Sequence, residues 1–326
     1  MITVDTRQFM RALELASAAI PRRTNVPVLR RAKLVANGKL AIEGSDLDTF
    51  TRAELPYTGS ETAFTLPDPL AVRRAIAVAG GESTQIEPQV DDMANVRTGD
   101  LSMTLREAGR ERDHPGFEAV DHELFSATIS AAELRQIARI MSAISRDEIR
   151  YYLNGLHIVK VGNWTWRFQA TDGHRLMWID VPMPDASGAV HGAIIPRAWL
   201  RKAMTHFSRS KEPLRLTFGH RMPRNEPGVE LDVAPPTPPA EPRRLSLSGD
   251  FGGVGFTLAG KLIDSAYPDV ERLIPKSHDH SARIATADLT RALHSVSAIS
   301  GEKTRAVKLA FPQPGNVLVS LNSAVM

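Results

Sequence analysis

Apolar residues recur at helical spacing in three separate segments of the chain, and these segments resemble one another. Residues 6–23 (TRQFMRALELASAAIPRR), 131–148 (AAELRQIARIMSAISRDE) and 286–303 (TADLTRALHSVSAISGEK) each have the pattern of an amphipathic helix. Each segment opens with a capping-type residue and closes on the small-residue sequence AAI or SAI. The similarity predicts an internal repeat.

The repeat continues beyond these helices. When Ile20, Ile144 and Ile299 are aligned, the copies lie 124 and 155 residues apart. A β-rich segment follows each helix, and in the first two copies a second helix follows over 66–79 and 195–207, with a proline near its start. One unit therefore consists of strand, helix, strands, helix and strands. This order predicts an α+β fold built from repeated domains.

The larger of the two spacings has a source in the sequence. Residues 221–244 (RMPRNEPGVELDVAPPTPPAEPRR) contain seven prolines, which can neither continue a helix nor fill a central strand. We expect this insertion to be extended, mobile and dispensable. The predicted organisation is one domain over 1–123, a second over 124–277 that carries the insertion, and a partial third over 278–326.

Composition places the chain among ordinary globular proteins, with 42% hydrophobic and 24% charged residues. There is no cysteine in the 326 residues, which excludes a disulfide framework, a thiolate zinc site and a cysteine nucleophile. The first residues lack the apolar core of a signal peptide, and no apolar run reaches the roughly 20 residues of a membrane helix. We therefore expect a cytoplasmic protein.

Basic residues are unevenly distributed, although the net charge is only +3. No acidic residue lies between Glu14 and Glu43 or between Asp185 and Glu212. Acid-free basic stretches suit a phosphate-facing surface, because each neutralised phosphate releases counterions. A solvated protein face is the alternative. The two stretches contain Arg22, Arg23, Arg30, Arg31, Lys33 and Lys39, and Arg197, Arg201, Lys202, Arg209 and Lys211.

Five motifs in a fixed order carry a resemblance to a known family. They are IPRRTNVPVL (20–29), IEGSDLDT (42–49), RYYLNGLHI (150–158), ATDGHRL (170–176) and LIDSAYPDVERLIPK (262–276). With the threefold repeat, they resemble the bacterial DNA polymerase III β subunit, the sliding clamp, over essentially the whole chain. The resemblance implies repeated clamp domains with helices on the DNA-facing side and antiparallel sheets outside. It implies a bacterial, cytoplasmic processivity factor for DNA replication that encircles double-stranded DNA of any sequence and tethers the polymerase.

The resemblance also implies where DNA is contacted. The loop of Arg22 and Arg23 and the segment 146–152 match positions near the DNA path, although Asp147 and Glu148 weaken the positive charge there. The second helices of the first two repeats supply further arginines and a lysine. For the tyrosine pair, packing in a strand is the alternative. The predicted DNA-binding set is Arg22, Arg23, Arg73, Arg74, Arg146, Arg150, Tyr151, Tyr152, Arg197, Arg201 and Lys202.

A second implied site is a cleft for extended peptide motifs of the polymerase III catalytic subunit, the clamp loader and other clamp-binding proteins. Apolar walls would receive the side chains of the partner, and polar groups would fix its register. By itself, the TDGHR sequence is more typical of a strand and turn with a hydrogen-bonded histidine. The predicted cleft consists of Leu153, Thr171, Gly173, His174, Arg175, Leu176, Pro268, Arg272 and Leu273.

Catalysis by this chain is not expected. Asp172 and His174 would share one face of a predicted strand and could form an acid–base pair, and Ser145 or Ser300 could be a nucleophile. The sequence, however, has no nucleophile elbow, phosphate-binding loop, HExxH motif or carboxylate cluster. His174 has no second metal ligand at a useful spacing, so we expect no metal and no cofactor. The resemblance implies a non-catalytic subunit of a DNA-directed DNA polymerase, a nucleotidyltransferase holoenzyme.

The third repeat has fewer residues than the first two, which bears on oligomeric state. In the family, two subunits close a ring head to tail through an edge strand, here LSMTL (101–105), and the end of the third amphipathic helix. We expect no stable two-subunit ring from this chain by itself, because the later part of the third repeat has no counterpart. The alternative function is a truncated clamp-like DNA-binding or regulatory protein that forms no ring on its own. The implied interface residues are Leu101, Met103, Ala298 and Ile299.

Overall fold

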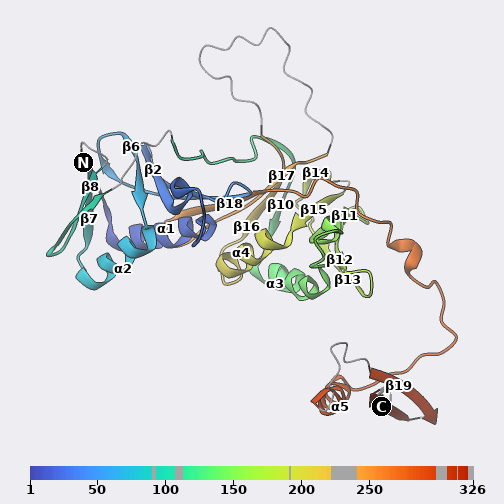
Figure 1. Cartoon of the computed structure of the whole chain (residues 1–326). Coiled ribbons are helices and arrows are strands. Elements are labelled where there is room, and N and C mark those ends of the chain that lie inside the picture. Colours follow the sequence, from blue (N-terminus) through green and yellow to red (C-terminus); the bar gives the residue numbers. More distant parts are fainter. Residues whose placement is uncertain are drawn as a thin grey trace, which may run out of the picture. The chain divides into compact units, whose positions relative to one another are not determined.

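The computed structural model describes residues 1–89, 93–106, 113–190, 192–221, 241–298, 307–313 and 315–321. They belong to two compact units, Met1–Tyr267 and Pro268–Met326, which are treated separately below. Figure 1 shows the course of the chain and the labels of the elements.

The first unit opens with a five-stranded antiparallel sheet in the order β5-β1-β7-β8-β9. Side chains alternate in burial along β1, β7 and β8, so one face of the sheet packs in the core, where Ile86 and Val96 are fully buried. Among the strands that the structure describes, β9 pairs only with β8 and forms an edge. The strands are β1 (Ile2–Asp5), β5 (Thr58–Gly59), β7 (Ser83–Pro88), β8 (Met93–Thr98) and β9 (Leu101–Arg106).

A nine-stranded antiparallel sheet runs through the middle of the same unit, in the order β14-β10-β16-β17-β18-β4-β3-β2-β6. Its strands come from both of the first two sequence repeats. The strands of the first repeat are β2 (Arg31–Asn37), β3 (Lys39–Ser45), β4 (Thr49–Leu55) and β6 (Thr62–Pro67). Those of the second repeat are β10 (His122–Ile129), β14 (Ser187–Gly188), β16 (Leu214–His220), β17 (Arg244–Asp250) and β18 (Gly255–Lys261).

The third sheet of the first unit has four antiparallel strands in the order β13-β12-β11-β15. Its inner face carries the fully buried rings of Trp166 and Phe168 from β12. Gly155, which opens β11, lies so close to Ile194 and Ile195 that a Cβ atom would approach the Ile195 carbonyl to 2.7 Å. The strands are β11 (Gly155–Lys160), β12 (Thr165–Thr171), β13 (Leu176–Pro182) and β15 (Ala193–Pro196).

Four helices lie along one side of the first unit, below the nine-stranded sheet in the view of Figure 1. The Asp5 and Asp68 carboxylates cap α1 and α2, and Ser130 and Glu133 form a reciprocal capping box at α3. Helix α4 follows Pro196 without a side-chain cap. The helices are α1 (Thr6–Ala16), α2 (Pro69–Ala79), α3 (Ala131–Arg139) and α4 (Arg197–Phe207).

The first helix of the first and second repeats is shorter than the sequence pattern predicts. After α1 and α3 the chain tightens into 3-10 turns over Ser17–Ala19 and Ile140–Ala143. Ile20 and Ile144 then adopt extended backbone, which ends the helical path. The periodic pattern of apolar residues continues through such a turn, so the sequence could not reveal where the helix ends.

The first and second repeats are joined by pairing of β4 with β18, from Thr49↔Gly260 to Glu54↔Gly255. Beside this pairing, Phe207, Phe251 and Phe256 pack in mutual contact, with the Phe207 and Phe256 ring centroids 5.1 Å apart. The cluster binds α4 to β18 in the interior of the unit.

The predicted proline-rich insertion, 221–244, lies mostly outside the described residues. Its two ends are described, and both are tied to one carboxylate. Arg221 donates to Glu118 Oε1 at 2.5 Å, and Arg244, the first residue of β17, donates to Glu118 Oε2. Arg244, the last residue of the predicted insertion, thus belongs to the sheet.

The second unit contains helix α5 (Thr286–Ala298) and a hairpin of β19 (Val307–Gln313) and β20 (Asn316–Leu321). Helix α5 matches the third predicted amphipathic helix over its described residues. Its side chains are exposed or half-buried, as are those of the hairpin.

The predicted α+β architecture with helices on one side and antiparallel sheets on the other is confirmed. Among the residues that the structure describes, no helix is both long and apolar enough to cross a membrane.

We predict that Phe256→Ala lowers the free energy of unfolding by about 3–5 kcal/mol, because it removes a ring that is 1% exposed from the contact between α4 and β18. Urea denaturation measures the change. Val78→Ala is the control, since Val78 is 90% exposed and its truncation should change stability by less than about 0.5 kcal/mol. A loss below about 1 kcal/mol in Phe256→Ala would contradict the importance of this cluster.

Candidate nucleic-acid interface and peptide site

Three predicted DNA-contacting arginines lie close together at the start of α4. Arg197 is the first residue of the helix, Arg201 lies one turn later, and Arg146 comes from the loop after α3. Partial burial lowers the pKa of Arg197, and the positive charges of Arg146 and Arg201 lower it further. Like charges held this close repel one another, and binding of an anion relieves the repulsion. This cluster is referred to below as the α4 arginine cluster.

The loop and helix arginines of the first repeat are also exposed. Arg22 and Arg23 lie in the loop that follows α1, and Arg74 lies on α2. Among the residues that the structure describes, these three side chains and those of Arg146 and Arg201 have no carboxylate partner. These five arginines are members of the predicted DNA-binding set whose charge no neighbouring carboxylate among those residues offsets.

Three other basic residues of the predicted set already have acidic partners. Arg73 pairs with Glu14 at 3.2 Å, Arg150 with Asp147 at 2.9 Å, and Lys202 with Asp46 at 2.5 Å. The hydrogen bond from Arg150 lowers the pKa of the Asp147 carboxyl. Each pair reduces the charge available to a phosphate, so these three residues are weaker candidates than the unpaired arginines.

The tyrosine pair lies in a 3-10 turn, Tyr151–Leu153, and not in a strand. Tyr151 is 54% exposed and Tyr152 is half-buried, and their rings meet edge to face with centroids 6.1 Å apart. The alternative of strand packing is therefore wrong. An exposed tyrosine ring beside arginines offers a hydroxyl to a phosphate and a ring face to an unstacked base.

The predicted peptide site centres on the turn between β12 and β13. Asp172 Oδ1 accepts hydrogen bonds from the backbone N–H groups of His174 and Arg175, at 3.0 and 3.1 Å. Thr171 Oγ1 accepts from the Gly173 N–H and donates to the Arg175 carbonyl. The turn is thus fixed by its own side chains, and Gly173 takes the left-handed conformation that it requires, with φ of 90°.

The expectation that Asp172 and His174 share one face of a strand is wrong, because both lie in this turn. Burial acts to raise the pKa of Asp172, but hydrogen bonds from the backbone and from the Arg175 guanidinium outweigh it and hold the pKa below its usual value. The carboxylate is occupied by these bonds and is not directed at the His174 ring. Ser145, the other described candidate for catalysis, is buried and its hydroxyl accepts from the Asp147 N–H; Ser300 lies outside the described residues.

The exposed part of this turn consists of Gly173, His174 and Arg175, with Leu176 half-buried beside them. Arg175 also donates to the Ser142 carbonyl at 2.8 Å, which ties the turn to the 3-10 turn after α3. Leu153, predicted as an apolar wall, is only 4% exposed and packs in the core. Within the first unit, Leu176 is therefore the apolar residue of the predicted cleft that a partner can reach.

The same turn occurs in the first repeat. Asp46 Oδ1 accepts from the N–H groups of Asp48 and Thr49, and Ser45 Oγ accepts from the Leu47 N–H at 2.9 Å. Leu47 has a φ of 77° at the position where the second repeat has Gly173. The agreement in hydrogen bonds shows that the two segments are structural copies, as the repeat in the sequence predicts.

The comparisons with known proteins agree with this geometry. Residues 128–269 match the family model of the DNA polymerase III β subunit, central domain. The β sliding clamp of Caulobacter vibrioides is 29% identical over 99% of this chain and 81% of its own length, and that of Salmonella typhimurium is 27% identical over 94% and 76%. The chain is thus similar to bacterial DNA polymerase III β subunits, the sliding clamps, in its central segment and in its relatives.

Solved structures of sliding clamps share the fold over nearly the whole chain. A crystal structure of the C. crescentus β sliding clamp aligns with a TM-score of 0.80 at 25% identity, covering 99% of this chain and 80% of that one. The β subunit from Streptococcus pyogenes DNA polymerase aligns with a TM-score of 0.80 at 20% identity, which supports the fold alone. The resemblance inferred from the five motifs is thereby confirmed.

The other residues that the sliding-clamp resemblance singles out are distributed over both units. Leu101 and Met103 are half-buried and alternate with exposed residues along the edge strand β9. In the second unit, Pro268, Arg272 and Ala298 are exposed and Leu273 is 77% exposed. Ile299 lies outside the described residues. The roles of these residues at the peptide cleft and the dimer interface remain predictions.

A half-buried aromatic contact near the peptide site was not anticipated from the sequence. The rings of His157 on β11 and Tyr267, the last residue of the first unit, stack at 4.4 Å and 5°. Gln169 lies 2.9 Å from His157 Nδ1 on the other side. Burial lowers the pKa of His157 to about 4 and raises the pKa of Tyr267 to about 12, so both rings are uncharged near neutral pH. The two residues are 110 positions apart, and no local pattern connects them.

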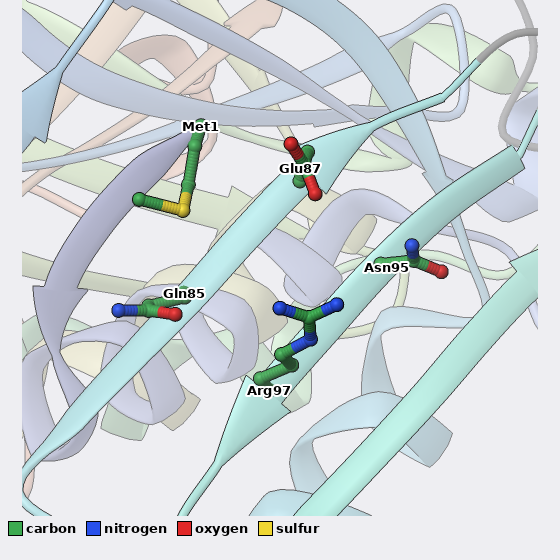
Figure 2. A pocket seen from close by; sticks show the side chains of 5 residues that line it. All are labelled: Met1, Gln85, Glu87, Asn95 and Arg97. Atoms are coloured by element: carbon green, nitrogen blue, oxygen red, sulfur yellow. The ribbon is translucent and has the colours of Figure 1, made fainter.

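A shallow depression on the five-stranded sheet is unrelated to these sites. Figure 2 shows its lining residues, which extend from β7 and β8 and from the start of the chain. They are Met1, Gln85, Glu87, Asn95 and Arg97, and none is a predicted site residue. Among the described residues there is also no group of three or more histidine, aspartate or glutamate side chains that could hold a metal ion.

We predict that the free energy of unfolding falls less on acidification in His157→Phe than in the unmodified chain. His157 has a pKa of about 4 in the native state and an ordinary value of 6.5, so between these values the unfolded chain binds a proton that the native chain does not. Native stability contributed by neutral His157 is therefore complete above pH 6.5 and declines as the pH falls towards 4, by about 2 kcal/mol near pH 5.

The measurement is the free energy of unfolding in urea near pH 7 and near pH 5. The decrease should be smaller in His157→Phe, which keeps a ring against Tyr267, than in the unmodified chain. His174→Ala is the control, because His174 is exposed and makes no ring contact. An equal decrease in His157→Phe and the unmodified chain would exclude His157 as the cause.

Proposed function

We propose that this chain acts as a DNA sliding clamp, the processivity factor that tethers DNA polymerase III to double-stranded DNA during replication in the bacterial cytoplasm. The observation that carries the proposal is the likeness to β sliding clamps over 99% of the chain, in sequence and in fold. The chain is a non-catalytic subunit of the polymerase holoenzyme. The alternative of a truncated clamp-like regulator has no specific observation in its favour.

For the DNA side of this function we assign the main role to arginines that have no carboxylate partner among the described residues. The α4 arginine cluster together with Arg22 and Arg23 supplies positive charge on the helices and the loops that adjoin them. Side chains of this kind contact phosphates and do not read base edges, which is what a protein that moves along DNA of any sequence requires.

For the partner side we assign the exposed turn of the second repeat. Leu176 supplies an apolar contact, and His174 and Arg175 supply polar groups next to it. Side-chain hydrogen bonds hold the turn in one conformation in the free protein, so little conformational entropy is lost when a partner binds. Its occupants in this proposal are extended peptide motifs of the polymerase III catalytic subunit, the clamp loader and other clamp-binding proteins.

The two sites lie next to each other in the first unit. Arg150, in the segment with the tyrosine pair, extends its guanidinium to Gly173, where a Cβ atom would meet Nη1 at 2.6 Å. A partner bound at the turn would therefore lie close to the segment that we assign to DNA. This proximity suits a protein that holds an enzyme near the duplex.

We predict that the double variant Arg146→Ala/Arg201→Ala binds duplex DNA more weakly and with a shallower salt dependence. Each lost phosphate contact reduces the slope of log K against log salt by about 0.9. Fluorescence anisotropy with a labelled duplex of arbitrary sequence, over a series of salt concentrations, measures the slope. Arg22→Ala/Arg23→Ala should behave in the same way.

The matched control is Arg97→Ala, because Arg97 is exposed on the outer face of the five-stranded sheet (Figure 2). It changes the net charge without touching the proposed DNA surface, so its slope should equal that of the unmodified chain. If Arg97→Ala shifts the slope as much per charge as the double variants do, binding is non-specific attraction to the whole molecule. An unchanged slope in both double variants would remove these four arginines from the site.

We also predict that Leu176→Asp lowers the affinity for a peptide from the C-terminal tail of a bacterial polymerase III catalytic subunit by at least about tenfold. A charge at this position would have to be desolvated against the apolar side chain of the peptide. Isothermal titration calorimetry gives the affinity. Leu273→Asp, in the second unit, tests the remaining predicted wall, and binding that survives both changes would place the peptide site elsewhere.

A further inference from the structure

A tryptophan in the middle of β13 is exposed beside the proposed peptide site. Trp178 is 44% exposed, although large apolar side chains in the middle of strands are usually covered. It follows Leu176 by two residues on the same strand, so both side chains project from the same face of the sheet about 7 Å apart. The register confirms the shared face, since Leu176 lies opposite Thr171 and Trp178 lies opposite Gln169.

The indole ring is held in place by its neighbours on this face. The Arg167 guanidinium lies 5.6 Å from the Trp178 ring centroid. Arg167 is in turn fixed by two hydrogen bonds to the Asp180 carboxylate, at 2.7 and 2.9 Å. The bond from Arg167 lowers the pKa of Asp180, so the pair stays charged near neutral pH. The tryptophan is therefore a positioned ring and not a freely rotating surface side chain.

The surface beneath the indole is also rigid. Gln169, directly across from Trp178, is 6% exposed and its amide nitrogen lies 2.9 Å from His157 Nδ1. His157 is covered by the stacked ring of Tyr267. Trp178, Gln169 and His157 thus form one row across β13, β12 and β11, and only the tryptophan end of the row is open to a ligand.

We propose that Trp178 is a specificity-determining contact of the peptide site, against which a partner peptide packs an aromatic or aliphatic side chain two residues away from the one that contacts Leu176. The proposal rests on the proposed function, since it requires an extended peptide at Leu176. An extended peptide projects every second side chain to one side at a spacing of about 7 Å, which matches the distance from Leu176 to Trp178.

The chemistry of the site decides between kinds of side chain. A cationic side chain is disfavoured because the Arg167 guanidinium already lies near the ring. A carboxylate would gain little, because Arg167 is committed to Asp180. An apolar ring or chain gains by covering exposed indole surface, and an aromatic pair adds about 0.5–1.5 kcal/mol beyond the area that it buries.

The test is a double-mutant cycle between the chain and a peptide series. The peptides derive from the C-terminal tail of a bacterial polymerase III catalytic subunit, with a single phenylalanine in place of alanine at successive positions on either side of the apolar anchor. Calorimetry measures their affinity for the unmodified chain, Trp178→Ala and Trp164→Ala. Trp164 is the matched control, because it is 58% exposed but lies in the turn at the opposite end of β12.

We expect one position, two residues from the anchor, to gain about three- to tenfold in affinity from phenylalanine. The gain should disappear in Trp178→Ala and persist in Trp164→Ala. Trp178→Gln is included as a second variant that keeps a long side chain over Gln169, and it should also lose the gain. Circular dichroism and the unfolding midpoint confirm that each variant is folded.

The outcomes separate this proposal from the proposed function. If Leu176→Asp weakens peptide binding but no phenylalanine position gains, or if the gain persists in a folded Trp178 variant, Trp178 is not part of the site. If Leu176→Asp and the Trp178 variants all leave peptide binding unchanged, the peptide site itself lies elsewhere and both assignments are wrong. If lysine at that position of the peptide raised the affinity as much as phenylalanine does, binding would depend on charge attraction and not on apolar packing, and the proposal would be wrong.

Discussion

The antiparallel pairing of β4 with β18 is the contact on which the arrangement of the first unit depends. It joins a strand of the first repeat to a strand of the second over six residue pairs and makes their sheets continuous. Figure 1 shows α1 to α4 on the same side of this unit. The helices that carry the arginines of α2 and α4 therefore lie on one side of a unit whose two repeats are joined through the sheet.

The turn at Asp46 in the first repeat and the turn at Asp172 in the second have the same hydrogen bonds but different surroundings. In the first repeat, Asp46 also binds Lys202 of α4 and Asp48 binds Lys261 of β18, so the turn helps to join two repeats. Leu47 is held there in a left-handed conformation that is unfavourable for a residue with a Cβ atom. In the second repeat the turn has Gly173, His174 and Arg175 in place of Leu47, Asp48 and Thr49, which relieves the backbone strain and leaves polar side chains exposed. The same hydrogen bonds therefore stabilise a junction in one copy and, in the other, hold the exposed side chains to which we assign partner binding.

The sequence predicted those parts of the fold that depend on local pattern. The α1, α3 and α5 helices, the proline-opened α2 and α4, and the strands around Asp46 and Asp172 follow from periodicity and from the repeat. The ends of α1 and α3 were missed because a 3-10 turn preserves the spacing of apolar residues. Long-range partners could not be inferred either. Nothing near Arg73 or Lys202 in the sequence indicates that Glu14 and Asp46 neutralise them, and His157 gives no local sign of Tyr267. The sequence tells which residues are charged. Whether a charge is available to a ligand depends on which residues pair in the three-dimensional structure.

This distinction divides the basic residues of the chain into two groups with different energetic roles. Arg73, Arg150 and Lys202 have carboxylate partners, and Lys202 with Asp46 links two repeats. The α4 arginine cluster has the opposite arrangement, since Arg146 and Arg201 act on Arg197 by repulsion. Repulsion between like charges lowers the stability of the free protein, and an approaching phosphate backbone removes that cost while it releases counterions. Fold stability alone would favour a carboxylate beside Arg197. We therefore propose a polyanionic ligand, DNA, for this cluster, in which no arginine has a carboxylate partner among the described residues.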